Sequence, residues 1–128
     1  MFRLFPTQSY ERDLKRYAKN RPAELKAVLD NLDKYLQSLQ AGVKPLQIKA
    51  GFIHPEPQGV IAIDQKGGGK NLAQTRLYVF PDVEAEVLYL IVLGDKNSQK
   101  SDIQASREFV NELIKQKASD GEDKREDI

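Results

Sequence analysis

The feature that most constrains the fold of this chain is residues 87–93, VLYLIVL, a run with no polar position. A strand with one face in solvent alternates apolar and polar side chains, whereas a strand covered on both faces is apolar throughout. This run therefore predicts a central strand. Residues 75–80 are rich in β-branched and aromatic side chains and predict a second strand, which residues 81–85 can join to the first as a hairpin.

Two amphipathic segments near the N-terminus can cover such a sheet. Residues 9–20 and 22–40 place apolar side chains on one face at helical spacing. Pro22 suits the first position of the second helix, and Gly42 suits the residue after its end. Together the two segments predict an N-terminal helical hairpin.

The last helix is predicted from Ser101 to about Lys117. Ser101 and Gln104 have the spacing of a capping box, and apolar side chains recur on one face behind them. Residues 117–128 have many charges and no apolar periodicity, which indicates a disordered charged tail. A chain of 128 residues can bury one core and not two, so we expect a single domain at residues 1–116.

The remaining segments complete the order of elements. Residues 2–5 are rich in apolar side chains and end at Pro6, which predicts a short first strand at a sheet edge. Residues 43–58 hold three prolines and indicate a loop, with a short extended piece at 46–48, and residues 59–64 predict a strand. The order β-α-α-β-β-β-α predicts an α+β fold with a mainly antiparallel sheet and a C-terminal helix.

Composition bounds the class of protein. The chain has no cysteine, which excludes disulfides and thiolate metal sites and makes the cytoplasm the expected compartment. Its apolar runs are far shorter than a membrane span, and its first residues lack the apolar core of a secretory signal, so we expect no membrane partner. Residues 1–76 carry 13 Lys/Arg against seven Asp/Glu, which permits an acidic partner such as RNA or a ribosome surface.

An arginine stands inside an otherwise apolar strand. Period-2 alternation places Arg76, Tyr78 and Phe80 on one face of the strand at residues 75–80. One interpretation is a phosphate clamp beside a base-stacking or proton-donating tyrosine. The other is structural: Arg76 pairs with Asp64 or Glu86 on a neighbouring strand, and Tyr78 completes the edge of the core. The sequence leaves both interpretations open.

The segment GDKNSQKSDIQ connects the apolar strand to the last helix. If Ser101 caps that helix, the backbone N–H groups of the loop can hold an anion, and Lys96 and Lys100 would strengthen the site. Asp95 and Asp102 stand beside these lysines and would partly neutralise them. The alternative is a connecting turn with solvated lysines.

The glycine-rich segment GGGK at residues 67–70 does not match a phosphate-binding P-loop. That motif needs glycine where Asp64 stands and Ser or Thr after Lys70. The segment predicts a flexible hairpin loop that carries Lys66 and Lys70 and can reach RNA.

The only histidine, His54, lies before a proline in FIHPEP. Histidine is the residue type whose unperturbed pKa lies near neutral pH, so His54 is a candidate general base, with Asp64 as an alternative. A lone histidine does not complete a metal site, and no carboxylate spacing indicates one, so we expect no metal and no cofactor.

Two stretches of the chain resemble a known family. TRLYVF and VLYLIVLGDKNSQKSDIQASREFVNELIKQK are similar to the RelE/ParE toxin superfamily, within it the HigB-like branch, and the likeness of element order extends over residues 2–115. In that family the middle strand of the meander begins with an arginine-bearing motif, here at Arg76, and a lysine-bearing loop precedes the last helix. The resemblance implies a RelE-like fold and a ribosome-dependent endoribonuclease that cuts mRNA and is silenced by a cognate antitoxin.

The chemistry of such a nuclease defines the candidate residues. The ribose 2′-OH attacks the adjacent phosphodiester, so the site needs a base, a proton donor and cations for the charge that develops on phosphorus. Arginine suits this task because its planar fork grips two phosphate oxygens. The candidate catalytic residues are Arg76, Tyr78, Lys66, Lys96, His54 and Asp64, and the candidate phosphate-binding residues are Lys49, Lys70 and Lys100.

The chain also departs from this family. Active RelE-like nucleases are more basic, and many carry a histidine or tyrosine where Asp95 and Lys96 stand here. Lys66 is the nearest cation to the position where the preceding strand typically ends in arginine. A non-catalytic protein-binding or regulatory module on the same scaffold remains an alternative, as does a toxin with another target, because the ParE branch acts on DNA gyrase. An unrelated small α+β protein with the same order is a further alternative.

Overall fold

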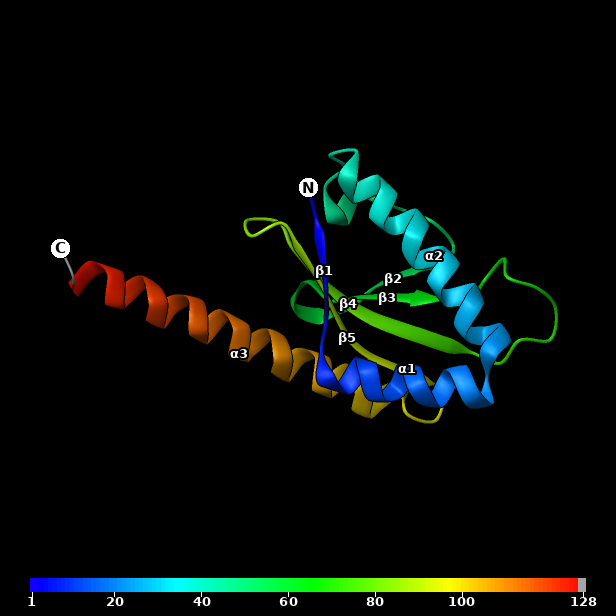
Figure 1. Ribbon diagram of the computed structural model, residues 1–128. Coiled ribbons are helices and arrows are strands. Elements are labelled where there is room, and N and C mark those ends of the chain that lie inside the picture. The colour runs from blue at the N-terminus through cyan, green and yellow to red at the C-terminus, as the bar shows by residue number, and fades with distance from the viewer. Residues whose placement is uncertain (127–128) are drawn as a thin grey trace.

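The computed structural model describes the backbone of residues 1–126 and the side chains of residues 1–120. A five-stranded sheet, with strand order β1-β5-β4-β3-β2, lies between two helical layers (Figure 1). The helices α1 and α2 pack on one face and α3 packs on the other. The elements are β1 (Arg3–Pro6), α1 (Gln8–Asn20), α2 (Pro22–Gln40), β2 (Ile53–Pro55), β3 (Ile61–Asp64), β4 (Thr75–Asp82), β5 (Val87–Asp95) and α3 (Gln99–Glu126).

The apolar run forms the central strand, as its pattern predicts. β5 is antiparallel to β4 and parallel to β1, and its residues from Leu90 to Gly94 are buried. Leu88, Leu90 and Leu93 pack against the helical hairpin, while Ile91 and Val92 pack under α3. The prediction of an α+β fold with a mainly antiparallel sheet, an N-terminal helical hairpin and a C-terminal helix is therefore confirmed.

The first strand lies at a sheet edge, as predicted. Each residue of β1 pairs with β5 on one side only. The side-chain amide of Gln40 covers the backbone of Phe2, since Oε1 accepts from its N–H at 2.8 Å and Nε2 donates to its carbonyl at 3.0 Å. An edge strand exposes unpaired backbone groups, and this contact satisfies two groups of the residue directly before the strand.

The predicted order of elements was wrong in the middle of the chain. The segment 43–58, expected to be a loop, contains β2, which pairs antiparallel with β3 through Ile53 and Ile63. Of the expected extended piece at 46–48, residues 46 and 47 lie instead in a short 3₁₀ turn, Pro45–Gln47, and Ile48 is extended. The prolines of this segment indicated a loop, but an edge strand tolerates proline, and β2 ends at Pro55 on the edge of the sheet.

The last helix differs from its prediction at both ends. It begins at Gln99, two residues before Ser101, and the Ser101 hydroxyl donates to the Ser98 carbonyl at 2.9 Å instead of forming a capping box. It continues to Glu126, through most of the segment 117–128 expected to be a disordered tail, and projects beyond the sheet (Figure 1). Residues 127–128 lie outside the described part of the chain. Over the described residues, none of the helices combines the length and apolarity needed to cross a membrane.

Candidate functional site

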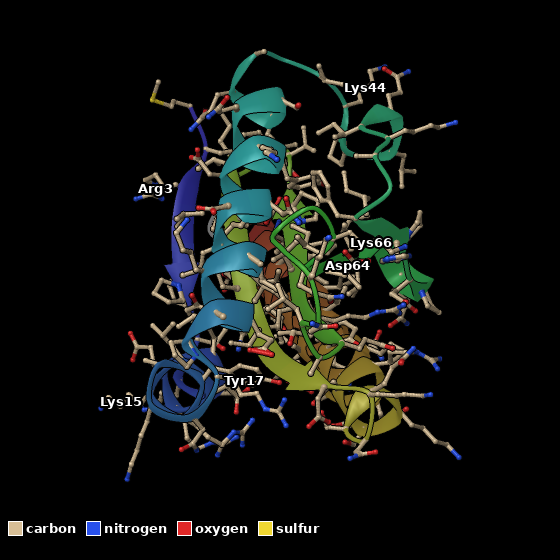
Figure 2. All side chains as sticks on the ribbon, turned by 90° about the vertical axis from the view of Figure 1, so that its right-hand side faces the viewer. Arg3, Lys15, Tyr17, Lys44, Asp64 and Lys66 are labelled. Atoms are coloured by element: carbon tan, nitrogen blue, oxygen red, sulfur yellow. The ribbon has the colours of Figure 1, made fainter. Side chains whose placement is uncertain are left out.

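Three neighbouring strands carry charged side chains to one end of the sheet. In the sheet register His54 lies opposite Ala62, and Asp64 lies opposite Arg76. Side chains of paired residues point to the same face of a sheet. His54, Asp64 and Arg76 therefore share the face on which α3 packs, near the edge formed by β2. Figure 2 shows Asp64 and Lys66 on the opposite side of the molecule from Arg3.

The centre of the site is a contact between His54 and Asp64. The distance from His54 Nε2 to Asp64 Oδ2 is 2.6 Å. Asp64 is buried, with 3% of its surface exposed, whereas 27% of the His54 side chain is exposed. The other oxygen of Asp64 accepts from the Lys66 backbone N–H at 2.7 Å, and the Lys66 ammonium lies 3.7 Å from Oδ2. A buried carboxylate thus orients an imidazole that solvent can reach.

Asn31 on α2 forms hydrogen bonds with the turn that follows β3. Asn31 is buried in α2, and its Nδ2 donates to the carbonyls of Asp64 and Lys66, both at 2.9 Å. The same turn packs closely on α2, because a Cβ on Gly68 would stand 2.2 Å from the Ala27 Cβ. Sequence reasoning missed Asn31, although a polar residue between Val28 and Leu32 on an apolar helix face is the signal that could have found it.

Arg76 lies between Asp64 on β3 and Gly94 on β5. Its Nη1 is 3.9 Å from Glu56 Oε1, and its Nε is buried with no hydrogen-bond partner among the described residues. The predicted pairings with Asp64 and Glu86 are not found, because Asp64 contacts His54, and Glu86 binds the N-terminal ammonium at 2.9 Å. Glu56 is the partner that sequence reasoning missed.

The structure does not place Tyr78 where it could touch a substrate. Its side chain is fully buried in the cluster beneath α3, beside Ala62 and Val110. Burial raises the pKa of its phenol far above the usual value, and its hydroxyl has no hydrogen-bond partner within the described residues. The predicted base-stacking or proton-donating role is therefore replaced by a core role, since α3 covers this part of the strand face.

The loop between β5 and α3 is closed by its own side chains. Asp95 Oδ1 accepts from the backbone N–H groups of Asn97 at 2.9 Å and Ser98 at 3.1 Å. The Ser98 hydroxyl donates to Asp102 Oδ2 at 2.7 Å, and Asp102 stands over Gly94, where a Cβ would approach Oδ2 to 1.9 Å. The backbone amides predicted to hold an anion already bind carboxylate, so this loop is a structural connection.

Four of the five predicted lysines lie away from the His54–Asp64 contact. Lys96 and Lys100 are exposed and make no hydrogen bond or ion pair with the side chains that the structure describes. Lys70 is exposed in the loop 65–74, and Lys49 lines an apolar pocket beside Leu46. Of the lysine candidates, only Lys66 joins the site.

Asp102 gives the loop a pH dependence. Burial raises the pKa of its carboxyl above the ordinary value of 3.8, and the nearby charges of Asp13 and Asp95 raise it further. Because the folded-state pKa lies above the unfolded value, this group stabilises the fold below pH 3.8, and the contribution is lost as the pH rises through the folded-state pKa. We therefore expect Asp102→Asn to raise the free energy of unfolding at neutral pH, because asparagine can still accept from Ser98 and carries no charge.

Urea denaturation of the wild type and of Asp102→Asn across an acid-to-neutral pH series measures this effect. The difference in stability should be greatest at neutral pH and should shrink as the pH falls below the folded-state pKa of Asp102. A difference that is constant with pH would show that the carboxylate of Asp102 is not destabilised in the folded protein.

Comparison with known proteins identifies no relative. No family model, no curated protein and no solved structure matches the chain. Within the described residues, no group of three or more His, Asp or Glu side chains is arranged to hold a metal ion.

Proposed function

We propose that this chain is a RelE-like toxin of a type II toxin–antitoxin system and acts as a ribosome-dependent mRNA endoribonuclease that uses no metal. The observation that carries the proposal is the contact between His54 and the buried Asp64, beside Lys66 and Arg76. The resemblance of TRLYVF and of the strand–loop–helix segment to the HigB-like branch supports it.

The proposed base is His54. A carboxylate only accepts hydrogen bonds, so the contact with Asp64 places the imidazole hydrogen on Nε2 and leaves a lone pair on Nδ1. Nδ1 takes the proton of the ribose 2′-OH as the 2′ oxygen attacks the adjacent phosphorus. Asp64 keeps the imidazole in this tautomer and stabilises the imidazolium that forms.

The proposed cations are Lys66 and Arg76. The bond from phosphorus to the 5′ oxygen breaks as the 2′ oxygen bonds, and the ammonium of Lys66 gives the departing oxygen its proton. The products are a 2′,3′-cyclic phosphate and a 5′-hydroxyl. Arg76, whose side chain is 19% exposed and whose Nη1 lies 3.9 Å from Glu56 Oε1, would stabilise the phosphorane-like transition state through its guanidinium.

The proposed partners follow from the same function. They are the ribosome with its mRNA in the cytoplasm, and a cognate antitoxin protein that silences the toxin. The excess of basic residues over residues 1–76 suits an RNA surface.

Inducible expression tests the proposal, with growth and mRNA integrity followed in the same cultures. We expect the wild type to arrest growth and cut transcripts, and Arg76→Gln to do neither, because glutamine removes the charged guanidinium and leaves a shorter, neutral polar side chain. Arg3→Gln is the matched control, since Arg3 is exposed on the opposite side of the molecule (Figure 2). Tyr78→Phe should act like the wild type because its hydroxyl is buried.

Circular dichroism of the purified variants shows whether each is folded. If cells that express the wild type grow normally with intact transcripts, the nuclease proposal fails, and the charged cluster is a structural or protein-binding feature. Growth arrest with intact transcripts would instead favour another target, such as DNA gyrase.

A further inference from the structure

A polar pocket opens at the same end of the sheet as the His54–Asp64 contact. It has a volume of about 280 Å³ and lies between the end of α1 and the loop that follows β5. Figure 2 shows Tyr17 on the side of α1 that faces the sheet and Lys15 on the outer side. The pocket is lined by Arg16, Tyr17, Asn20, Arg21, Asp95 and Ser98.

The two arginines of this pocket have guanidinium N–H donors that their ion pairs do not use. Arg16 Nη2 lies 3.3 Å from Asp13 Oδ1, and Arg21 Nη1 lies 3.9 Å from Glu24 Oε2. Each of those carboxylates also accepts a backbone N–H at 3.1 Å, from Leu93 and Ala73 respectively. About half of each arginine side chain is exposed, 55% and 49%, and the Arg16 guanidinium lies 5.7 Å from the centre of the Tyr17 ring. Each guanidinium carries five N–H donors, so most are free for a ligand.

Asp95 adds an acceptor to the pocket. Its Oδ1 binds two amides of its own loop, whereas Oδ2 has no hydrogen-bond partner among the described residues. Two guanidinium groups and one carboxylate that line the same pocket suit a ligand that carries both an anionic group and a hydroxyl donor. In a ribonucleotide these are the phosphate and the 2′-OH, and the 2′-OH is the group that distinguishes RNA from DNA.

We infer that this pocket binds a phosphodiester of a single-stranded RNA through Arg16 and Arg21, while the neighbouring ribose 2′-OH donates to Asp95. The inference rests on the proposed function and adds a second phosphate contact and a basis for RNA specificity to it.

The sheet register relates the pocket to the His54–Asp64 contact. Asp95 pairs with Thr75, the residue before Arg76, and Arg76 pairs with Asp64. Asp95 on β5 and Asp64 on β3 are therefore two strand spacings apart across the sheet, a distance of roughly 10 Å. The pocket opens on the α1 side of the sheet end, and His54 and Asp64 lie on the α3 side. A single-stranded RNA that bends around this end of the sheet would contact both the pocket and the His54–Asp64 pair.

Binding to a short labelled RNA oligonucleotide, measured by fluorescence anisotropy over a salt series, tests the inference. The measurements use the His54→Ala background, so that the RNA is not cut. We expect Arg16→Gln/Arg21→Gln to weaken binding and to reduce the slope of log K against log salt by about 0.7, the value for one phosphate contact on a single strand. Arg3→Gln/Arg107→Gln is the matched control, because both arginines are exposed and lie outside the pocket.

Asp95→Asn tests the specificity. Asparagine keeps an oxygen for the loop amides and loses the second carboxylate oxygen, so the loop should stay folded. We expect the ratio of RNA affinity to affinity for DNA of the same sequence to fall by about tenfold or more, as for the loss of a hydrogen bond to a charged group.

Three results would overturn the inference. One is an unchanged salt slope and affinity in the double arginine variant. Another is an unchanged RNA-to-DNA ratio in Asp95→Asn. The third is adenosine 5′-monophosphate binding as tightly as the oligonucleotide, which would make the ligand a free nucleotide.

The two proposals can fail separately. If the wild type cuts RNA but the pocket variants bind it normally, the inference about the pocket fails and the nuclease proposal stands. If the pocket variants lose RNA binding but the wild type does not cut, the pocket stands and the nuclease fails.

Discussion

Replacing His54 by alanine is expected to lower the rate of RNA cleavage by roughly 10²- to 10⁴-fold, the usual contribution of a general base. The proposed base has no equivalent substitute nearby, because Asp64, the neighbouring carboxylate, is buried and its Oδ1 accepts from the Lys66 backbone. Single-turnover cleavage of mRNA on programmed ribosomes measures the effect directly, since it separates chemistry from product release.

Added imidazole provides the control for this variant. It should restore part of the activity of His54→Ala and none of the activity of Arg76→Gln, because it supplies a base and not a guanidinium. Asp64→Asn should also be slow, since an amide can donate to the imidazole and stabilise the wrong tautomer. Cleavage by His54→Ala at the wild-type rate would show that the His54–Asp64 contact is structural.

Replacing Asp13 by alanine is expected to lower the free energy of unfolding by about 1–3 kcal/mol, the cost of leaving a buried backbone donor without a partner. Asp13 is buried on α1, and its Oδ2 accepts from the Leu93 N–H at 3.1 Å. The register of β1 with β5 ends at Leu90, so β1 does not reach this part of the central strand. Asp13 therefore takes the place of a neighbouring strand.

Asparagine at this position is the matched control for Asp13→Ala. Asp13→Asn keeps an oxygen that can accept from Leu93, so most of the stability should return although the charge is lost. Urea denaturation followed by circular dichroism measures both variants. Equal stability of Asp13→Ala and the wild type would show that water satisfies the Leu93 N–H.

Local patterns predicted most of the scaffold. The run at residues 87–93 required cover on both faces, and the structure provides it with the hairpin on one side and α3 on the other. The predicted last helix began two residues late, because the spacing of Ser101 and Gln104 matched a capping box that does not form. Ser98 closes the connection instead, through contacts with Asp95 and Asp102 that depend on how the loop folds.

The sequence predicted individual residues of the candidate site but not which of them are in contact. His54 and Asp64 were named separately, as alternative bases, because nothing between them in the sequence indicated that they touch. Their contact requires β2 to pair with β3, and the prolines of segment 43–58 concealed that strand. Glu56, the partner of Arg76, was missed for the same reason.

The sequence by itself determined the elements with strong periodicity: the apolar central strand, the β4–β5 hairpin, and the two amphipathic helices of the hairpin. Their patterns report which face of each element is buried, and that information is local. Only the tertiary structure decided which charged groups meet. It buried Tyr78 under α3, brought His54 on β2 into contact with Asp64 on the neighbouring β3, and placed Arg16, Arg21 and Asp95 around one pocket. Strand register and helix packing set these contacts, and both depend on residues far apart in the chain.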